Sequence, residues 1–144
     1  MSNADDPFDL QRFVTAQQPI WPDVVAELSA GRKRSHWMWF VFPQLKALGR
    51  SQTALFYGID SLAEARAYLA HPQLGARLRS ATDLVLAANA PSLNALFGAP
   101  DDMKFRSSMS LFALADGNPE SCFHAALKRW CDGVMDPLTV SMLG

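Results

Sequence analysis

The chain has 144 residues, of which 49% are hydrophobic and 19% are charged, and its formal net charge is −1. This length corresponds to one domain with a sizeable core, and the near-neutral charge argues against the basic face of a nucleic-acid-binding protein. No apolar run reaches about 18 residues, the length that spans a bilayer. We therefore expect one globular domain whose partners include neither nucleic acid nor a membrane.

Two features bear on location and domain boundaries. The N-terminus is acidic and lacks the pattern of a signal peptide. The only cysteines, Cys122 and Cys131, would lie about 13 Å apart on one helix, too far for a disulfide, and free thiols suit a reducing compartment. We expect a cytoplasmic protein with a single helical domain over residues 6–144, preceded at residues 1–5 by a tail that partly resembles a cloning remnant.

Capping signals predict helices through the first half of the chain. One helix begins near Asp9 as its cap, and a second begins at Trp21-Pro-Asp23 and ends in a left-handed cap at Gly31. Ser61-Leu-Ala-Glu64 has the spacing of a capping box, in which the serine and glutamate side chains satisfy backbone N–H groups reciprocally. His71-Pro72 predicts the end of that helix and the cap of the next one.

Similar signals continue in the second half. Pro91-Ser92 opens a short helix that ends at Gly98, and Pro100 takes the first position of a helix running to about Ala115. Pro119-Glu120 begins a helix that ends near Gly133, and Asp136-Pro137 begins a brief terminal one. Because strand signals are almost absent, we predict an all-α fold: a single multihelical domain with buried central helices.

The apolar segment Trp37–Phe42 is ambiguous, because its residue types favour a strand. A lone strand would leave its backbone groups without partners. Ser35 is a suitable N-cap, and Pro43 marks an end. We therefore predict a short helix that is apolar all round and buried on every side.

A series of motifs extends along nearly the whole chain, from about Asp6 to the C-terminus. They are Asp9-Leu-x-Arg-Phe13, Ala16-Gln17, Gly31-Arg-Lys-x-Ser-His-Trp-Met-Trp-Phe-x-Phe-Pro-Gln44, Tyr57-Gly58, Ala67-Tyr-Leu-x-His-Pro-x-Leu-Gly75 and Phe97-Gly-x-Pro-Asp-Asp-x-Lys-x-Arg-Ser-Ser-Met109. In this order they resemble the family catalogued as domain of unknown function 1810. The resemblance implies a small cytosolic bacterial protein with a compact multihelical fold, and it implies no activity. Members sometimes carry a calpastatin label, although inhibitor repeats of that kind are disordered and this chain is globular.

The polar residues before the apolar segment are candidates for a site. His36 is expected just inside a helix N-terminus, where a neutral imidazole can act as a general base; a core-edge histidine bonded to a backbone carbonyl is the alternative. Arg34 and Ser35 precede it. Cations before a helix N-terminus favour an anionic ligand, but they also follow the C-terminus of the preceding helix, where they are favourable without any ligand.

Aromatic and amide side chains add to this region. Trp37 and Trp39 lie about 200° apart on a helix, so one packs in the core while the other can offer a stacking surface; core packing of both is the alternative. The side-chain amide of Gln44 either forms hydrogen bonds with the edge of a ligand or caps a turn. Tyr57 either joins the site or marks a helix end before glycine.

A second group lies on the predicted helix from Pro100. Lys104 and Arg106 stand beside Ser107 and Ser108, and hydroxyls next to cations suit the oxygens of an anionic ligand. The alternatives are a surface ion pair between Asp102 and Arg106 and close helix packing at the two small serines.

Other signatures are missing from the sequence. The glycines lack the spacing of dinucleotide or phosphate loops, and no cluster of Cys and His matches a metal site. We therefore expect no cofactor and no metal, and the sequence specifies no oligomeric state.

Our leading hypothesis is a protein that binds or processes an anionic small molecule, of nucleotide- or ADP-ribose-like type, in a pocket near His36 and Arg106. In an enzyme, His36 would be the base, and Arg106 or Arg34 would stabilise negative charge. The alternative is a non-enzymatic helical module that docks a partner protein through an exposed apolar patch.

Overall fold

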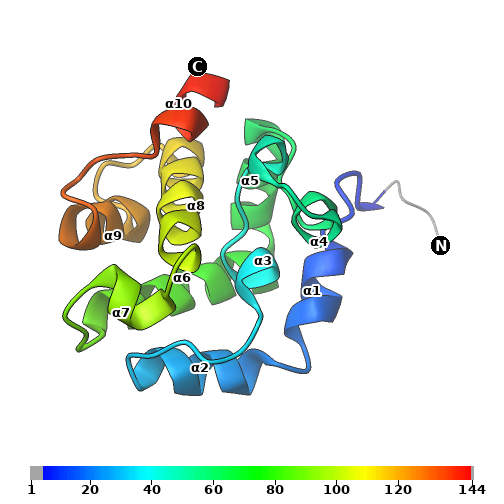
Figure 1. Cartoon of the computed structure of the whole chain (residues 1–144). Helices are drawn as coiled ribbons and strands as arrows, with labels where there is room; N and C mark the ends of the chain where they lie inside the picture. The colour runs from blue at the N-terminus through cyan, green and yellow to red at the C-terminus, as the bar shows by residue number, and fades with distance from the viewer. Residues whose placement is uncertain (1–4, 144) are drawn as a thin grey trace.

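A computed structural model describes residues 5–143, so the predicted tail lies outside it apart from Asp5. The described residues form helices and no strand, which confirms the all-α prediction (Figure 1). The elements are α1 (Gln11–Gln17), α2 (Trp21–Ser29), α3 (Met38–Val41), the 3₁₀ helix η2 (Lys46–Leu48), α4 (Gln52–Phe56), α5 (Leu62–Ala70), α6 (Pro72–Ala87), α7 (Leu93–Phe97), α8 (Asp101–Asp116), α9 (Cys122–Trp130) and α10 (Pro137–Leu143).

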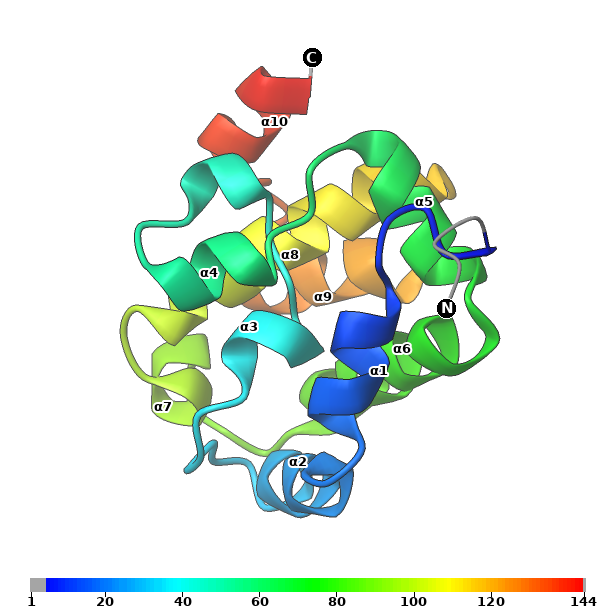
Figure 2. The ribbon, with the colours of Figure 1, turned by 90° about the vertical axis from the view of Figure 1, so that its right-hand side faces the viewer.

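Helix α8 is the central element of the domain. It contacts α5, α7, α9 and α10, and most of the residues in its C-terminal two thirds are buried. Helix α6 packs against α2, α5 and α9, and α1 contacts α3 and α6 (Figures 1 and 2). This arrangement confirms the prediction of buried central helices in a single domain.

Most predicted caps are present. The side chains of Ser61, His71 and Ser92 each accept hydrogen bonds from backbone N–H groups of the helix that follows. Gly31 and Gly98 both have φ values of +74°, which favour glycine, although the ψ of Gly98 is 171° and lies outside the left-handed helical region. Local sequence signals therefore located these helix ends.

The predicted cap of α1 at Asp9 is wrong. Asp9 has a φ of 52°, and the helix begins at Gln11. The side chain of Asp6 accepts hydrogen bonds from Leu10 N (2.7 Å) and Gln11 N (3.0 Å). An aspartate three residues earlier takes over the capping role, because the chain turns before it enters the helix.

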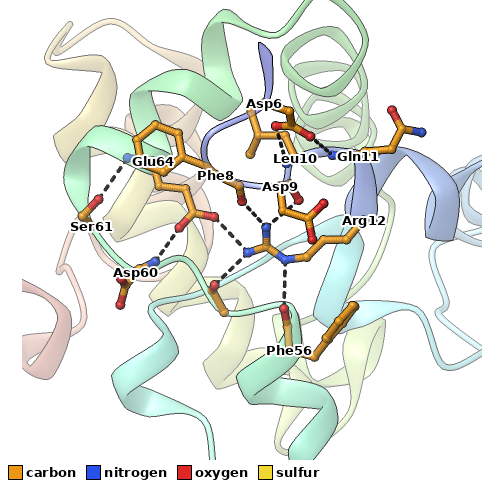
Figure 3. A network of polar contacts seen from close by, with 11 residues as sticks. Asp6, Phe8, Asp9, Leu10, Gln11, Arg12, Phe56, Asp60, Ser61 and Glu64 are labelled. Carbon is orange, nitrogen blue, oxygen red and sulfur yellow. Dashed lines mark hydrogen bonds and ion pairs between the residues drawn. The ribbon is translucent and has the colours of Figure 1, made fainter. Parts of the chain in front are cut away.

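The capping box at α5 is only half formed, because Glu64 has other partners (Figure 3). Its carboxylate accepts a hydrogen bond from Asp60 N (2.9 Å) and pairs with Arg12 Nη2 (2.9 Å). The Arg12 guanidinium also donates to the carbonyl oxygens of Phe8, Asp9, Phe56 and Gly58. One buried ion pair thus joins the N-terminal segment, α5 and the end of α4.

The apolar segment forms less helix than predicted, since α3 is a single turn. Met38, Val41 and Phe42 are buried, but Trp39 and Phe40 are only half-buried, so burial on every side is wrong for these two. The turn lies at the edge of the core, where one side of it stays open. Ser35 does not cap it, because its hydroxyl donates to a carboxylate of α2.

Helices η2 and α4 had no sequence prediction. Two of the five α4 residues, Leu55 and Phe56, are large apolar side chains exposed to solvent, so the helix lacks a buried apolar stripe. The helix end predicted at Tyr57-Gly58 is confirmed, although Gly58 has no positive φ. A Cβ atom at Gly58 would overlap Lys46, so glycine permits the bridge that pairs Leu45 with Ile59.

Two further predictions can be compared with the described residues. Both cysteines are free and half-buried, and burial raises the pKa of Cys122 to about 11, so this thiol is protonated at neutral pH. None of the helices in residues 5–143 has the length and apolar character needed to cross a membrane.

Candidate ligand-binding site

Hydrogen bonds to one carboxylate, that of Glu27 in α2, hold the loop before α3 against that helix. It accepts hydrogen bonds from the backbone N–H groups of Arg34 (2.6 Å) and Ser35 (2.8 Å). It also accepts them from the Ser35 hydroxyl (2.7 Å) and from Trp37 Nε1 (3.0 Å). Burial opposes the charge of this carboxylate, but the hydrogen bonds outweigh burial and lower the pKa of Glu27.

These hydrogen bonds involve three predicted ligand residues, of which Arg34 takes part only through its backbone N–H. Arg34 and Ser35 are exposed and hold Glu27, and Trp37 is buried in the core. Trp37 therefore cannot face a pocket, and the half-buried tryptophan is Trp39. The sequence placed the two rings on opposite sides, but only the fold decides which of them the core covers.

His36 is exposed to solvent and lines none of five cavities found along residues 5–143. It does not lie at the edge of the core as predicted, because the loop turns its side chain outward between two anchored neighbours. Lys33, earlier in the same loop, lies 2.8 Å from the Asp101 carboxylate and 5.0 Å from the centre of the Trp37 ring. Of the three cations in Arg32-Lys33-Arg34, the side chain of Lys33 thus has structural contacts.

Arg106 binds the segment that leads to α10 through hydrogen bonds. Its guanidinium donates to the carbonyl oxygens of Val134 (2.9 Å) and Met135 (3.0 Å). It lines an open cavity of about 410 Å³ that also includes Trp130 and Asp132. His36 and Arg106 therefore do not share a pocket, and the predicted pairing of base and oxyanion stabiliser does not form.

The two serines of α8 have different surroundings. Ser107 Oγ donates to the Met103 carbonyl (3.1 Å), and the residue lines a cavity. Ser108 is fully buried, and its hydroxyl has no hydrogen-bond partner among the described residues. Ser107 can reach a ligand, whereas Ser108 lines none of the five cavities.

The largest of the five cavities, about 680 Å³, lies between the η2–α4 segment, the first half of α8 and α10. We call it the main cavity. Its volume is within the range of small-molecule sites. Apolar side chains, among them Met103, Leu138 and Met142, cover most of its wall. The polar residues that line it are Gln44, Arg50, Ser51, Lys104, Ser107 and Asp136, of which Gln44, Lys104 and Ser107 were predicted as ligand residues.

A small cavity of about 10 Å³ adjoins the main cavity and shares Gln44, Ala54 and Lys104 with it. Trp39 and the predicted ligand residue Tyr57 form its far side. Lys104 Nζ lies 5.3 Å from the centre of the Trp39 ring. The fold therefore gathers four of the predicted residues, Gln44, Tyr57, Lys104 and Ser107, around two neighbouring cavities.

The charged side chains of the main cavity leave an excess of positive charge. Arg50 forms no ion pair within residues 5–143, whereas Lys104 Nζ forms a long ion pair (3.8 Å) with Asp101, whose carboxylate also pairs with Lys33 at 2.8 Å. The one carboxylate on the wall, Asp136, accepts hydrogen bonds from the backbone N–H and hydroxyl of Thr139. An anionic group entering this cavity would meet two cations and one carboxylate that is already engaged.

Sequence reasoning missed Arg50 and Asp136 as cavity residues, and it left open which of Trp37 and Trp39 would face a ligand; Trp39 is the one that lines a cavity. The signal for Arg50 was present, since the cation stands between Gly49 and the Ser51 cap and therefore on a surface turn. No group of three or more His, Cys, Asp or Glu side chains within residues 5–143 is arranged to hold a metal ion.

Comparisons with known proteins agree with this fold. The crystal structure of the conserved hypothetical protein Rv1873 from Mycobacterium tuberculosis is 55% identical in sequence, with 96% of this chain and 98% of that chain covered and a TM-score of 0.92. No curated protein matches the chain. A family model described as "Protein of unknown function (DUF1810)" matches residues 7–143. The chain therefore belongs to the DUF1810 family of proteins of unknown function.

Proposed function

We propose that this protein binds an anionic small molecule with an apolar body in the main cavity. One observation supports the proposal above all: Arg50 and Lys104 face a largely apolar cavity of about 680 Å³ whose only carboxylate, that of Asp136, is engaged elsewhere. A site that combines an apolar wall with a few convergent polar groups has the usual character of a ligand pocket.

The proposed roles follow from position and charge. Arg50 and Lys104 hold the anionic group through charge-assisted hydrogen bonds, and Ser107 and Gln44 supply neutral hydrogen bonds beside them. The methionines Met103 and Met142 adapt to the apolar part of the ligand, since their side chains are flexible. Nucleotide-like molecules belong to this class, although the wall of the main cavity contains no aromatic side chain, which favours an aliphatic body.

We propose binding rather than a reaction for this cavity. His36, the base expected from the sequence, lies outside it, and Lys104 and Arg50 are suited to hold an anion rather than to accept a proton. A second role, docking of a partner protein, is supported by exposed apolar side chains such as Phe56 and Leu138.

A thermal-shift and calorimetric panel tests the proposal. The probes are octanoate, octyl phosphate, AMP and ADP-ribose, and the proteins are wild type, Arg50→Met and Lys104→Met, with His36→Ala and Arg32→Met as controls. We expect at least one probe to raise the Tm of the wild type and of both controls. Each cavity variant should bind that probe about 10- to 100-fold more weakly, because a charge-assisted hydrogen bond is lost.

Two results would overturn the proposal. One is the absence of a Tm shift with every probe, and the other is equal binding by wild type and the two cavity variants. A loss of binding in His36→Ala alone would instead support the site expected from the sequence.

A further inference from the structure

An open groove of about 460 Å³ lies on the surface next to α3 and α4, apart from the main cavity. We call it the aromatic groove. Four aromatic side chains and two neutral polar ones line it: Trp39, Phe40, Gln52, Thr53, Phe56 and Tyr57. Phe56 is 57% exposed, and the other three aromatic residues are half-buried. Such a concentration of partly exposed aromatic rings is typical of binding surfaces.

The rings of the aromatic groove pack against one another, and Tyr57 joins them to the core. Tyr57 packs against the buried Phe13, with 5.9 Å between ring centres. Phe40 and Phe56 lie 5.3 and 4.8 Å from Tyr57 and are inclined to it by 56° and 87°. The rings therefore form ridges with furrows between them rather than a flat patch.

The rings of the groove carry two hydrogen-bond donors, the Trp39 indole N–H and the Tyr57 hydroxyl. The indoles of Trp37 and Trp130 donate to Glu27 and to the Val85 carbonyl, whereas the Trp39 indole and the Tyr57 hydroxyl have no partner within residues 5–143. Neither group is among the buried polar atoms that lack a partner, so both reach solvent. A bound molecule can thus accept hydrogen bonds from both of them.

These properties define the chemistry of the partner. The lining residues carry no charge, so neither an anion nor a cation is favoured. A polyproline II segment exposes carbonyl groups that make no internal hydrogen bonds, and its prolines have no N–H groups that need acceptors. The proline rings of such a segment fit into furrows between aromatic side chains, as in known modes of proline-rich recognition.

We propose that the aromatic groove binds a proline-rich segment of another protein in the polyproline II conformation. The rings of Trp39, Phe56 and Tyr57 hold the proline side chains, and the indole N–H and phenolic O–H donate to carbonyl oxygens of the segment. The aromatic groove shares no lining residue with the main cavity, although Trp39 and Tyr57 also line the small cavity next to it, so the proposal does not rest on an anionic ligand there.

Titration of the ¹⁵N-labelled protein with a decaproline peptide tests the proposal. The four tryptophans give four indole N–H signals, of which three belong to rings outside the groove and serve as internal controls. We expect a saturable shift of the Trp39 signal alone at up to millimolar peptide, and no shift with a Gly-Ser peptide of equal length.

Surface variants make the test specific. Phe56→Ser removes an exposed ring of the groove and should weaken decaproline binding about tenfold or more. Val140→Ser, at a residue that is 41% exposed and lies outside both the groove and the main cavity, should leave binding unchanged. Because both side chains are exposed, both variants are expected to fold.

Several outcomes would overturn the proposal. They are an unmoved Trp39 signal, equal shifts with the Gly-Ser peptide, and equal affinity of Phe56→Ser and wild type. A Trp39 signal that moves with protein concentration alone would make a second copy of the chain the occupant. Octanoate binding lost in Lys104→Met but retained in Phe56→Ser would show that the main cavity works independently of the groove.

Discussion

The carboxylate of Glu27 accepts a hydrogen bond from the indole nitrogen of Trp37 at 3.0 Å, which joins the end of α2 to the loop before α3. The same carboxylate accepts hydrogen bonds from the backbone N–H groups of Arg34 and Ser35. Since Trp37 is buried, the position of the core aromatic segment depends on one acidic side chain of a neighbouring helix.

We expect Glu27→Gln to lower the free energy of unfolding at pH 7 by about 1–2 kcal/mol, because an amide replaces a charged acceptor at a partly exposed position. Hydrogen bonding holds the pKa of Glu27 below its ordinary value of 4.5, against the opposing effect of burial. A group with a lowered folded-state pKa contributes stability above the ordinary value and loses it as the pH falls through the folded value.

The difference between wild type and Glu27→Gln should therefore shrink as the pH falls below the ordinary pKa of 4.5 and through the lower folded-state value. Urea denaturation across this range measures it, and comparison of the two proteins cancels the titration of all other carboxylates. A constant difference from neutral to acid pH would mean that the charge of Glu27 does not stabilise the loop.

The Arg12–Glu64 ion pair should be a major contributor to stability. The side chains of Arg12 and Glu64 are only 11% and 4% exposed, and four backbone carbonyls also depend on the guanidinium. We expect Arg12→Met to cost about 3–5 kcal/mol, because it leaves a buried carboxylate without its partner. Chemical denaturation measures this loss.

Two further variants separate charge from packing at this site. Adding Glu64→Gln to Arg12→Met should recover part of the loss, since it removes the unpaired charge. Arg32→Met, at an exposed cation, should change stability by no more than about 0.5 kcal/mol. If Arg12→Met were as mild as Arg32→Met, the network in Figure 3 would not stabilise the fold.

Ser108 and Ser110 of α8 are both fully buried, yet they should respond to alanine in opposite ways. Ser108 has no partner for its hydroxyl, so Ser108→Ala should stabilise the protein by about 1 kcal/mol or more. Ser110 Oγ donates to the Arg106 carbonyl (2.7 Å) and accepts from Asp136 N (2.8 Å). Ser110→Ala should therefore destabilise it by about 1–3 kcal/mol. Thermal unfolding of the two variants side by side provides the measurement, and equal effects would contradict the hydrogen bonding described.

Phe42 should contribute more to stability than Trp39, although both belong to the apolar segment. Phe42 is buried, with its ring centre 5.0 Å from Phe105 and 5.8 Å from Phe97. We expect Phe42→Ala to cost about 3–5 kcal/mol. Trp39→Ala should cost less than half as much, because its ring is half in solvent. Urea denaturation of both variants measures these losses. A larger loss in Trp39→Ala than in Phe42→Ala would place Trp39 in the core.

Several elements could be predicted because their causes lie within a few residues. His71 caps α6 through hydrogen bonds to the N–H groups of Gln73 and Leu74, two and three positions further along. Ser92 and Gly98 bracket α7 for equally local reasons. Capping and apolar spacing act over one turn of helix, so the sequence displays them directly.

The site could be predicted only in part, because partners of polar side chains come from distant segments. Gln44, Lys104 and Ser107 were expected to face a ligand, and they do line the main cavity. Arg50 was predictable as a residue of a surface turn between Gly49 and Ser51, but it reaches the cavity only because the η2–α4 segment and the first half of α8 line the same space, which local sequence does not specify.

By itself, the sequence determined the helical class, the apolar core and most helix ends, since these depend on residue type and short spacing. Only the tertiary structure decided that Glu27 holds the loop of His36 away from the cavities. It also decided that Arg106 donates hydrogen bonds to backbone carbonyls of the segment before α10. The physical reason is that a hydrogen bond or ion pair requires two groups within about 3 Å. Packing brings groups from remote parts of the chain to that distance, and local spacing does not specify which ones.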